Sequence, residues 1–348
     1  MGQTLSEPVT NMISACCKDS KFLVGSSCMQ GWRSKMEDCH VHILSLPDDP
    51  EAAFFAVYDG HGGATMSQHA GKHLHDYILR TNEYKEGKIV EAMEQGFLQL
   101  DEAMQADDAL KAERVGTTVI AILIKDNVLY SANAGDSRAV ASISGRTIEL
   151  SRDHKPTLED EKRRIEAAGG WVGFNRVNGH LALSRALGDF KFKRNHSKSA
   201  EEQIVTAFPE VQTFQLTEDW EFIVLACDGI WDVMTSSEVV DFVRNHIACA
   251  DARDTINVND SSKKQTDSES SLVDPEDICE ELLNECLAPD TLMGTGCDNM
   301  TVVIVCLLHG KPQSDLILRC QRPPADPNTI IYKSTQSSRQ NDELLDFS

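Results

Sequence analysis

Residues 53–63 read AFFAVYDGHGG. The apolar first half predicts a buried strand, and that strand stops abruptly at an acid, Asp59. Gly60, His61 and two further glycines follow, so the backbone is free to bend directly beside a carboxylate and an imidazole. Taken alone, Asp-Gly after a strand is typical of a turn. The other acids of the chain decide whether this stretch is more than that.

Several other acids interrupt apolar runs in the same way. Asp228 ends FIVLACD, whereas Asp298 precedes MTVVIVCLL. In an antiparallel sheet the end of one strand lies beside the start of its neighbour, so such carboxylates can converge at one edge of the sheet. The acids placed at strand ends in this way are Glu37, Asp38, Asp59, Asp136, Asp228, Asp232 and Asp298.

Clustered carboxylates repel one another unless they are protonated or bind cations. Carboxylate oxygens, a backbone carbonyl and waters are the ligands that Mg²⁺ and Mn²⁺ prefer. We therefore interpret Asp59 as an acid fixed at a strand end to bridge two metals, with Gly60 offering its carbonyl. His61 would then lie beside a metal water, where an imidazole can transfer protons. Arg33, just before the acids of WRSKMED, offers a bidentate fork for phosphate, although a surface role is the ordinary alternative for a single Arg.

The pattern of apolar residues predicts alternating strands and helices from about residue 22 onward. Residues 116–150 form a predicted β-meander, in which short turns separate apolar runs. The other predicted strands are 23–29, 39–46, 52–58, 221–227 and 300–308, and the predicted helices are 64–79, 89–104, 158–168, 238–248 and 275–287.

A series of motifs resembles the protein phosphatase 2C family of metal-dependent Ser/Thr protein phosphatases (PPM type). The motifs are RSKMED, VYDGHGG, GTT, AGDSRA, LALSRALGD, LACDGIWD and DNMTVV, in the family's order over residues 22–310. The opening MGQTLSEP makes the chain most similar to the animal alpha/beta-type members. The resemblance implies an α+β fold in which two central antiparallel β-sheets pack as a sandwich flanked by helices, with a dinuclear metal site at one edge. The predicted order of elements is compatible with this sandwich but does not fix it.

The resemblance also implies residue roles. Two Mn²⁺ or Mg²⁺ ions are expected, bound by Asp59 as the bridging ligand, the Gly60 carbonyl, Asp228 and Asp298, with Glu37 and Asp38 holding metal waters. Asp136 and Asp232 match acids linked with a weaker third ion. Arg33 would bind the substrate phosphate and His61 would protonate the leaving alkoxide. Residues 155–190 match a flap beside the site.

The expected reaction is hydrolysis of phosphoSer and phosphoThr in proteins by direct attack of a metal-activated water, without a phospho-enzyme. The absence of a CxxxxxR phosphate loop argues against a cysteine phosphatase. Two alternatives are a catalytically inactive relative that binds phosphoproteins as a scaffold and a two-metal phosphodiesterase or nuclease. The formal net charge of −22 argues against the nuclease and against nucleic acid as a partner.

Composition gives expectations about the cellular setting. The 11 cysteines are odd in number and form no CxxC pair, which indicates reduced thiols inside a cell. No apolar run is long enough for a spanning helix. We expect a monomeric, cytoplasmic protein, and the nucleus is the alternative second location.

The chain is expected to have three parts. Residues 1–21 form a predicted flexible terminus, and their opening MGQTLS fits the acceptor pattern for myristate on Gly2. One acyl chain binds bilayers only weakly, so a minor membrane-associated fraction is expected; a plain flexible terminus is the alternative. Residues 22–310 form the phosphatase domain, in which the polar, acidic loop 250–273 is predicted to be disordered. Residues 311–348 form a C-terminal tail.

Overall fold

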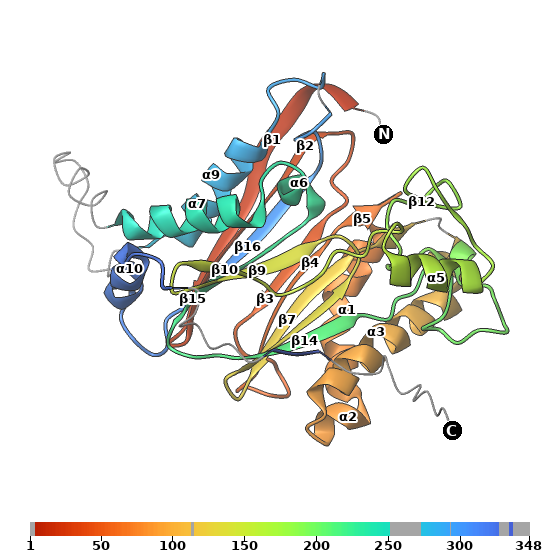
Figure 1. Ribbon diagram of the computed structural model, residues 1–348, viewed down its shortest axis with the longest axis horizontal. Helices are drawn as coiled ribbons and strands as arrows, with labels where there is room; N and C mark the ends of the chain where they lie inside the picture. The colour runs from red at the N-terminus through yellow and green to blue at the C-terminus, as the bar shows by residue number, and fades with distance from the viewer. Residues whose placement is uncertain (1–3, 113–114, 251–272, 293, 327–333, 337–348) are drawn as a thin grey trace, which may run out of the picture.

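The structure is a computed structural model that describes residues 4–112, 115–250, 273–292, 294–326 and 334–336 (Figure 1). Two six-stranded antiparallel sheets form its centre. The first has the order β1 (Thr4–Lys18), β2 (Phe22–Arg33), β16 (Met300–Leu307), β15 (Trp220–Ala226), β9 (Arg138–Ile143) and β10 (Arg146–Glu149). The second has the order β17 (Ser334–Gln336), β14 (Glu210–Gln215), β8 (Val128–Ala134), β7 (Val119–Lys125), β4 (Ala53–Tyr58) and β3 (Cys39–Ile43).

The two sheets pack face to face, and helices cover both outer faces (Figure 1). α7 (Ser236–Ala248), α9 (Pro275–Cys286) and α10 (Gln313–Gln321) lie on the first sheet. α1 (Thr65–Arg80) and α3 (Ile89–Ala106) lie on the second, with the short α2 (Asn82–Lys85) and α4 (Asp108–Ala112) beside them. The predicted α+β sandwich is confirmed by this architecture.

Strand β4 shows why this layering follows from the sequence. Phe55 and Val57 face the interior between the sheets, whereas Phe54 and Tyr58 face α1 and α3. Both faces of the strand are therefore buried, which is why the run is apolar throughout instead of alternating with polar residues. The central strands β15 and β16 are buried along their whole length for the same reason.

Smaller elements join the sandwich near one edge. β13 (Leu187–Gly188), β6 (Gly116–Thr117) and β5 (Gly60–His61) form a three-stranded sheet, and α6 (Asp228–Trp231) follows β15. α5 (Glu159–Ala167), the hairpin β11 (Val172–Gly173) and β12 (Arg176–Val177), and a 3-10 turn (Phe190–Phe192) make up the flap region. No helix among the described residues is long and apolar enough to cross a membrane.

The prediction of a flexible terminus over residues 1–21 was wrong for its larger part. Residues 4–18 form β1, an edge strand whose backbone pairs with β2. The side chains of β1 are exposed or half-buried, and its register with β2 shifts near Pro8. Apolar and polar residues therefore do not alternate regularly along the strand. The backbone pairing with β2 orders this segment without a buried apolar face.

The loop predicted over 250–273 lies outside the described residues, apart from its two end residues. Of the tail from residue 311, α10 packs against α7 and β15. Arg319 of α10 donates hydrogen bonds to the backbone carbonyls of Trp220 (2.6 Å) and Leu307 (2.8 Å), which attaches the helix to the first sheet.

Candidate active site

Strand register brings the acids of the two sheets to one edge of the sandwich. Cys39 pairs with Tyr58, so Asp38 and Asp59 occupy the next register position. Ala226 pairs with Arg138, which likewise brings Asp228, at the start of α6, close to Asp136.

The carboxylates of this cluster raise one another's pKa. Burial, followed by the nearby charge of Asp228, raises the pKa of Asp59 well above its ordinary value. Burial, followed by Asp136 and Asp298, does the same to Asp228. Burial is also the main cause that raises the pKa of Asp38 to about 7, and Asp298 adds to it. The site thus concentrates negative charge that a bound cation would stabilise.

Asp38 provides the observation that tests whether metals fit. Its Oδ2 accepts a hydrogen bond from Thr301 Oγ1 at 2.7 Å, while its buried Oδ1 has no hydrogen-bond partner among the described residues. One ligand atom each from Asp38, Asp59 and Cys227 lie within 4.8 Å of one another. Burial raises the pKa of Cys227 well above its usual range, which favours the neutral thiol over the thiolate. The oxygens of this cluster suit a hard divalent ion.

Gly60 allows the backbone to approach the acids closely. A Cβ at residue 60 would overlap the carbonyl oxygen of Glu37 and lie 2.9 Å from Ser67 Oγ. Ser67 donates a hydrogen bond to that same carbonyl, and the backbone N–H of Glu37 donates to Asn299 Oδ1 at 3.0 Å. The backbone at Glu37 is therefore fixed against Gly60, which only glycine permits.

The GTT motif explains how Asp59 is held. The backbone N–H of Thr118 and the hydroxyl of Thr117 both donate to the Asp59 carbonyl, at 2.9 and 3.1 Å. The backbone N–H of Asp59 in turn donates to Thr118 Oγ1 at 3.3 Å. These contacts fix the backbone of Asp59 at the end of β4.

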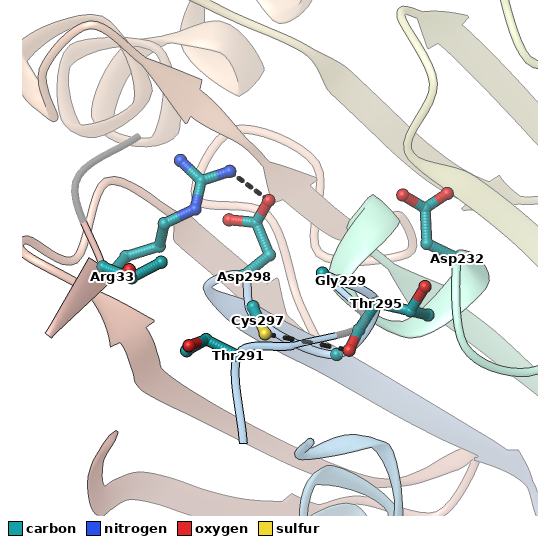
Figure 2. Close-up of a pocket in the computed structure, with 10 residues that line it drawn as sticks. Arg33, Gly229, Asp232, Thr291, Thr295, Cys297 and Asp298 are labelled. Carbon is teal, nitrogen blue, oxygen red and sulfur yellow. Dashed lines mark hydrogen bonds and ion pairs between the residues drawn. The ribbon is translucent and has the colours of Figure 1, made fainter. Parts of the chain in front are cut away.

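Arg33 lies beside the acids at the mouth of a cavity (Figure 2). Its guanidinium forms an ion pair with Asp298, and both side chains are about one-third exposed, at 35% and 33%. The cavity has a volume of about 210 Å³ and is lined by Thr4, Arg33, Gly229, Asp232, Thr291, Cys297, Asp298 and neighbouring glycine and threonine residues. A guanidinium that is reachable from solvent and lies beside the acid cluster can bind a phosphate group.

His61 forms a close pair with an acid that the sequence did not single out. Its Nε2 lies 2.5 Å from Oδ2 of Asp189, whose side chain is 3% exposed. Burial lowers the pKa of His61, but the charge and hydrogen bond of Asp189, together with the charges of Asp136 and Glu37, raise the pKa overall. Burial raises the pKa of Asp189, but His61, together with the charges of Lys193 and Lys191, lowers the pKa overall. The only signal for Asp189 in the sequence was its position at the end of the LALSRALGD motif.

The acids expected near a weaker third ion border this cluster. Asp136 is buried and accepts a hydrogen bond from Lys155 Nζ at 2.5 Å. Asp232 lies at the solvent-exposed side of the site, where partial loss of hydration raises the pKa of its carboxyl and the charge of Lys155 opposes that rise. Lys155 thus supplies a counter-charge that the sequence did not predict.

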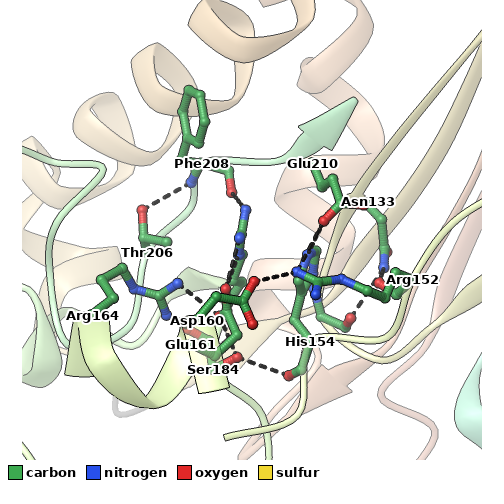
Figure 3. A network of polar contacts seen from close by, with 12 residues as sticks. Asn133, Arg152, His154, Asp160, Glu161, Arg164, Ser184, Thr206, Phe208 and Glu210 are labelled. Atoms are coloured by element: carbon green, nitrogen blue, oxygen red, sulfur yellow. Dashed lines mark hydrogen bonds and ion pairs between the residues drawn. The ribbon is translucent and has the colours of Figure 1, made fainter. Parts of the chain in front are cut away.

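A buried polar network fastens the flap region to the second sheet (Figure 3). Glu161 of α5 accepts hydrogen bonds from Arg185 (2.7 Å), Arg164 (2.7 Å) and Ser184 (2.5 Å). The Ser184 hydroxyl also lies 2.9 Å from the carbonyl of His154, which precedes α5. The network is one unit that holds the segments on both sides of the β11–β12 hairpin.

A known protein family matches most of this sequence. The sequence profile of protein phosphatase 2C matches residues 22–292. The chain belongs to the protein phosphatase 2C family. The predictions of the family and of a protein serine/threonine phosphatase are thereby confirmed, and the relatives agree.

Similar proteins occur in animals, fungi and plants. A probable protein phosphatase 2C of Caenorhabditis elegans is 59% identical over 98% of this chain and 90% of its own length. A protein phosphatase 2C homologue of Schizosaccharomyces pombe is 44% identical over 90% of this chain and 81% of its own. A probable protein phosphatase 2C of Arabidopsis thaliana is 38% identical over 94% and 98%.

Solved structures share the fold. A phosphatase from Toxoplasma gondii matches 85% of this chain and 96% of its own, with a TM-score of 0.65 and 25% identity. A C. elegans sex-determining protein matches 88% and 69%, with a TM-score of 0.65 and 26% identity. Both matches support the sandwich architecture of the phosphatase 2C fold.

Proposed function

We propose that this phosphatase hydrolyses phosphoSer and phosphoThr in proteins with two Mn²⁺ or Mg²⁺ ions held by the acid cluster, and that no phospho-enzyme forms. The observation that carries the proposal is the convergence of buried and half-buried carboxylates that raise one another's pKa, together with the unpartnered Oδ1 of Asp38. When bound, the ions supply positive charge against the phosphate and a coordinated water acidic enough to attack phosphorus near neutral pH. The residues that would hold them are Asp59, the Gly60 carbonyl, Asp228 and Asp298, with Glu37 and Asp38 acting through waters.

The protein's own groups bind the substrate and transfer the proton. Arg33 would orient the phosphate, because its guanidinium adjoins Asp298 at the solvent-open cavity. His61 would donate a proton to the leaving oxygen, since Asp189 raises its pKa and favours the protonated imidazole. A weaker third ion at Asp136 and Asp232 would compete with Lys155 for Asp136.

The experiment that tests the proposal measures metal dependence on phosphopeptides. Turnover of phosphoSer and phosphoThr peptides should vanish in excess EDTA and return on addition of Mn²⁺ or Mg²⁺. Undiminished turnover after chelation and buffer exchange would overturn the two-metal proposal. Comparing p-nitrophenyl phosphate with bis-p-nitrophenyl phosphate separates a monoesterase from the phosphodiesterase alternative, and binding of phosphopeptides without turnover would indicate the scaffold.

A second part of the proposal concerns the N-terminus and the setting of the enzyme. Gly2, which lies outside the described residues, is proposed to carry myristate because MGQTLS fits the acceptor pattern. With one acyl chain and an acidic body, the protein would be a largely cytoplasmic monomer with a minor membrane-associated fraction. Intact-mass analysis of protein from eukaryotic cells tests the modification, and an unmodified Gly2 there would rule it out.

A further inference from the structure

The LALSRALGD motif ends at Asp189, whose carboxylate contacts Nε2 of His61. We infer that Asp189 is a positioning residue that holds Nε2 of His61, so that Nδ1 is the ring nitrogen that delivers the proton to the leaving oxygen. This inference rests on the proposed function and adds a residue to it.

The small sheet beside the sandwich creates this contact. His61 of β5 pairs with Gly116 of β6, and Gly116 pairs with Gly188 of β13. The three residues therefore lie in one row, and Asp189 follows directly after it. A Cβ on Gly116 would overlap the Asp189 carboxylate and lie 2.6 Å from Nε2 of His61. The hydrogen bond therefore passes directly over Gly116, and only glycine leaves room for it.

The backbone around Asp189 is fixed independently of His61. Asp189 has φ of 50° and ψ of 35°, in the left-handed region, and its N–H donates to the Val115 carbonyl at 3.0 Å. The preceding N–H, of Gly188, donates to Asp101 Oδ1 at 2.8 Å. Asp101 also accepts a hydrogen bond from Lys193 Nζ at 2.8 Å, so the ammonium group of Lys193 pairs with Asp101. The carboxylate of Asp189 is left to the imidazole.

Asp189 and His61 differ in how far their side chains are exposed to solvent. Asp189 is 3% exposed, whereas the His61 side chain is 28% exposed. The Nε2 side of the ring is therefore anchored, while part of the His61 side chain remains accessible to solvent. When one ring nitrogen of a histidine is held by a carboxylate, the tautomer and the ring orientation are fixed for the other nitrogen.

The proposed step transfers one proton from His61 to the leaving alkoxide. As the P–O bond to the leaving group breaks, the Nδ1–H bond of His61 breaks and the leaving alkoxide gains that proton. The imidazole becomes neutral and keeps Nε2–H directed at Asp189, which does not change its own protonation. The attacking water forms the new P–O bond and releases a proton to solvent, and an equivalent proton from solvent returns to Nδ1 before the next turnover.

A double-mutant cycle tests this role. Asp189→Asn and His61→Gln should be made singly and together, and kcat measured with Mn²⁺ on a phosphoserine peptide and on p-nitrophenyl phosphate. Asn is compatible with the left-handed backbone at this position. We expect Asp189→Asn to lower kcat on phosphoserine by ~10-fold or more, within the roughly 10²–10⁴-fold that a general acid contributes. The loss should be much smaller on p-nitrophenyl phosphate, whose leaving group needs no proton, and absent when His61→Gln is already present.

Two further variants keep the test decisive. Gly116→Ala should reproduce the leaving-group dependence of Asp189→Asn, because its Cβ enters the space of the hydrogen bond. Asp101→Asn, which alters the support of the same loop without touching His61, should lower kcat equally for both leaving groups. Equal losses by Asp189→Asn with and without His61, or on both substrates, would overturn the inference and leave Asp189 structural. Loss of the leaving-group dependence of His61→Gln itself would instead overturn the proposed general acid.

Discussion

Glu161 should be the acid on which the stability of the flap region depends most. It is 1% exposed and lies between two guanidinium groups. Its Oε1 accepts from Nε (3.0 Å) and Nη2 (2.7 Å) of Arg185, and its Oε2 accepts from Arg164 (2.7 Å) and Ser184 (2.5 Å). In Glu161→Gln the amide NH₂ would face two donors, and two buried cations would lose their counter-charge. Removing one partner of such a buried ion pair costs about 3–5 kcal/mol of unfolding free energy.

The effect should depend on pH in a defined direction. Burial alone would raise the pKa of Glu161, but Arg185 and then Arg164 hold it well below the ordinary value of 4.5. A depressed pKa in the folded state means that the stabilisation is complete above pH 4.5 and is lost as the pH falls below it. The difference between wild type and Glu161→Gln should therefore be largest at pH 7 and shrink in acid.

Urea unfolding at pH 7 and at pH 4, at constant metal concentration, measures this difference. Native-state hydrogen exchange of residues 155–190 would show whether the loss is confined to the flap region. Glu159→Gln is the matched control, because Glu159 lies on the same helix and is 79% exposed, 3.9 Å from Arg163; little change is expected there. A loss under 1 kcal/mol at pH 7, or a loss that does not change with pH, would refute the reasoning.

Four further outcomes are expected. Asp228→Asn should nearly abolish turnover while raising the stability of the metal-free protein, because it removes a charge that its neighbours repel; near-wild-type kcat would show that Asp228 is not a ligand. Arg33→Ala should raise KM for phosphopeptides and weaken inhibition by inorganic phosphate, and Arg33→Lys should restore only part of the loss because Lys lacks the planar fork. Deletion of residues 251–272 should leave kcat on p-nitrophenyl phosphate within a few-fold, since their composition is that of a disordered loop; a collapse of activity would contradict this. Gly2→Ala should remove the membrane-associated fraction in cell fractionation without changing activity on soluble peptides.

The central strands could be predicted from the sequence because their burial is simple. β4, β15 and β16 are covered on both faces, so their residues are almost all apolar, with Glu221 and Thr301 as the exceptions, and each run has an acid near one end. The predicted strand at 300–308 differs from β16 by one residue. Acids at the ends of such runs also identified the cluster, since antiparallel register converts strand ends into spatial neighbours.

The remaining strands and contacts depend on pairings that produce no distinctive pattern in the sequence. β1 is a polar, bulged edge strand, and β14 (Glu210–Gln215) mixes buried with half-exposed residues, so neither shows the regular alternation of a half-buried strand. The partners Asp189 and Lys155 are 128 and 19 residues from the groups that they contact. An acid after a glycine or a lysine before a proline has no distinctive pattern, and only the folded arrangement shows what each contacts.

Gly60 is where the two parts of the site meet. The acids are placed by the large sheets, through the register of β3 with β4 and of β15 with β9, whereas His61 is placed by the small sheet of β5, β6 and β13. Because these are separate elements, a change at Asp189 can disturb proton transfer while the acids keep their positions. Gly60 belongs to both, since it pairs with Thr117 in the small sheet and its Cα lies against the Glu37 carbonyl. The glycine that follows Asp59 therefore joins the edge of the sandwich that carries the acid cluster to the small sheet that carries His61.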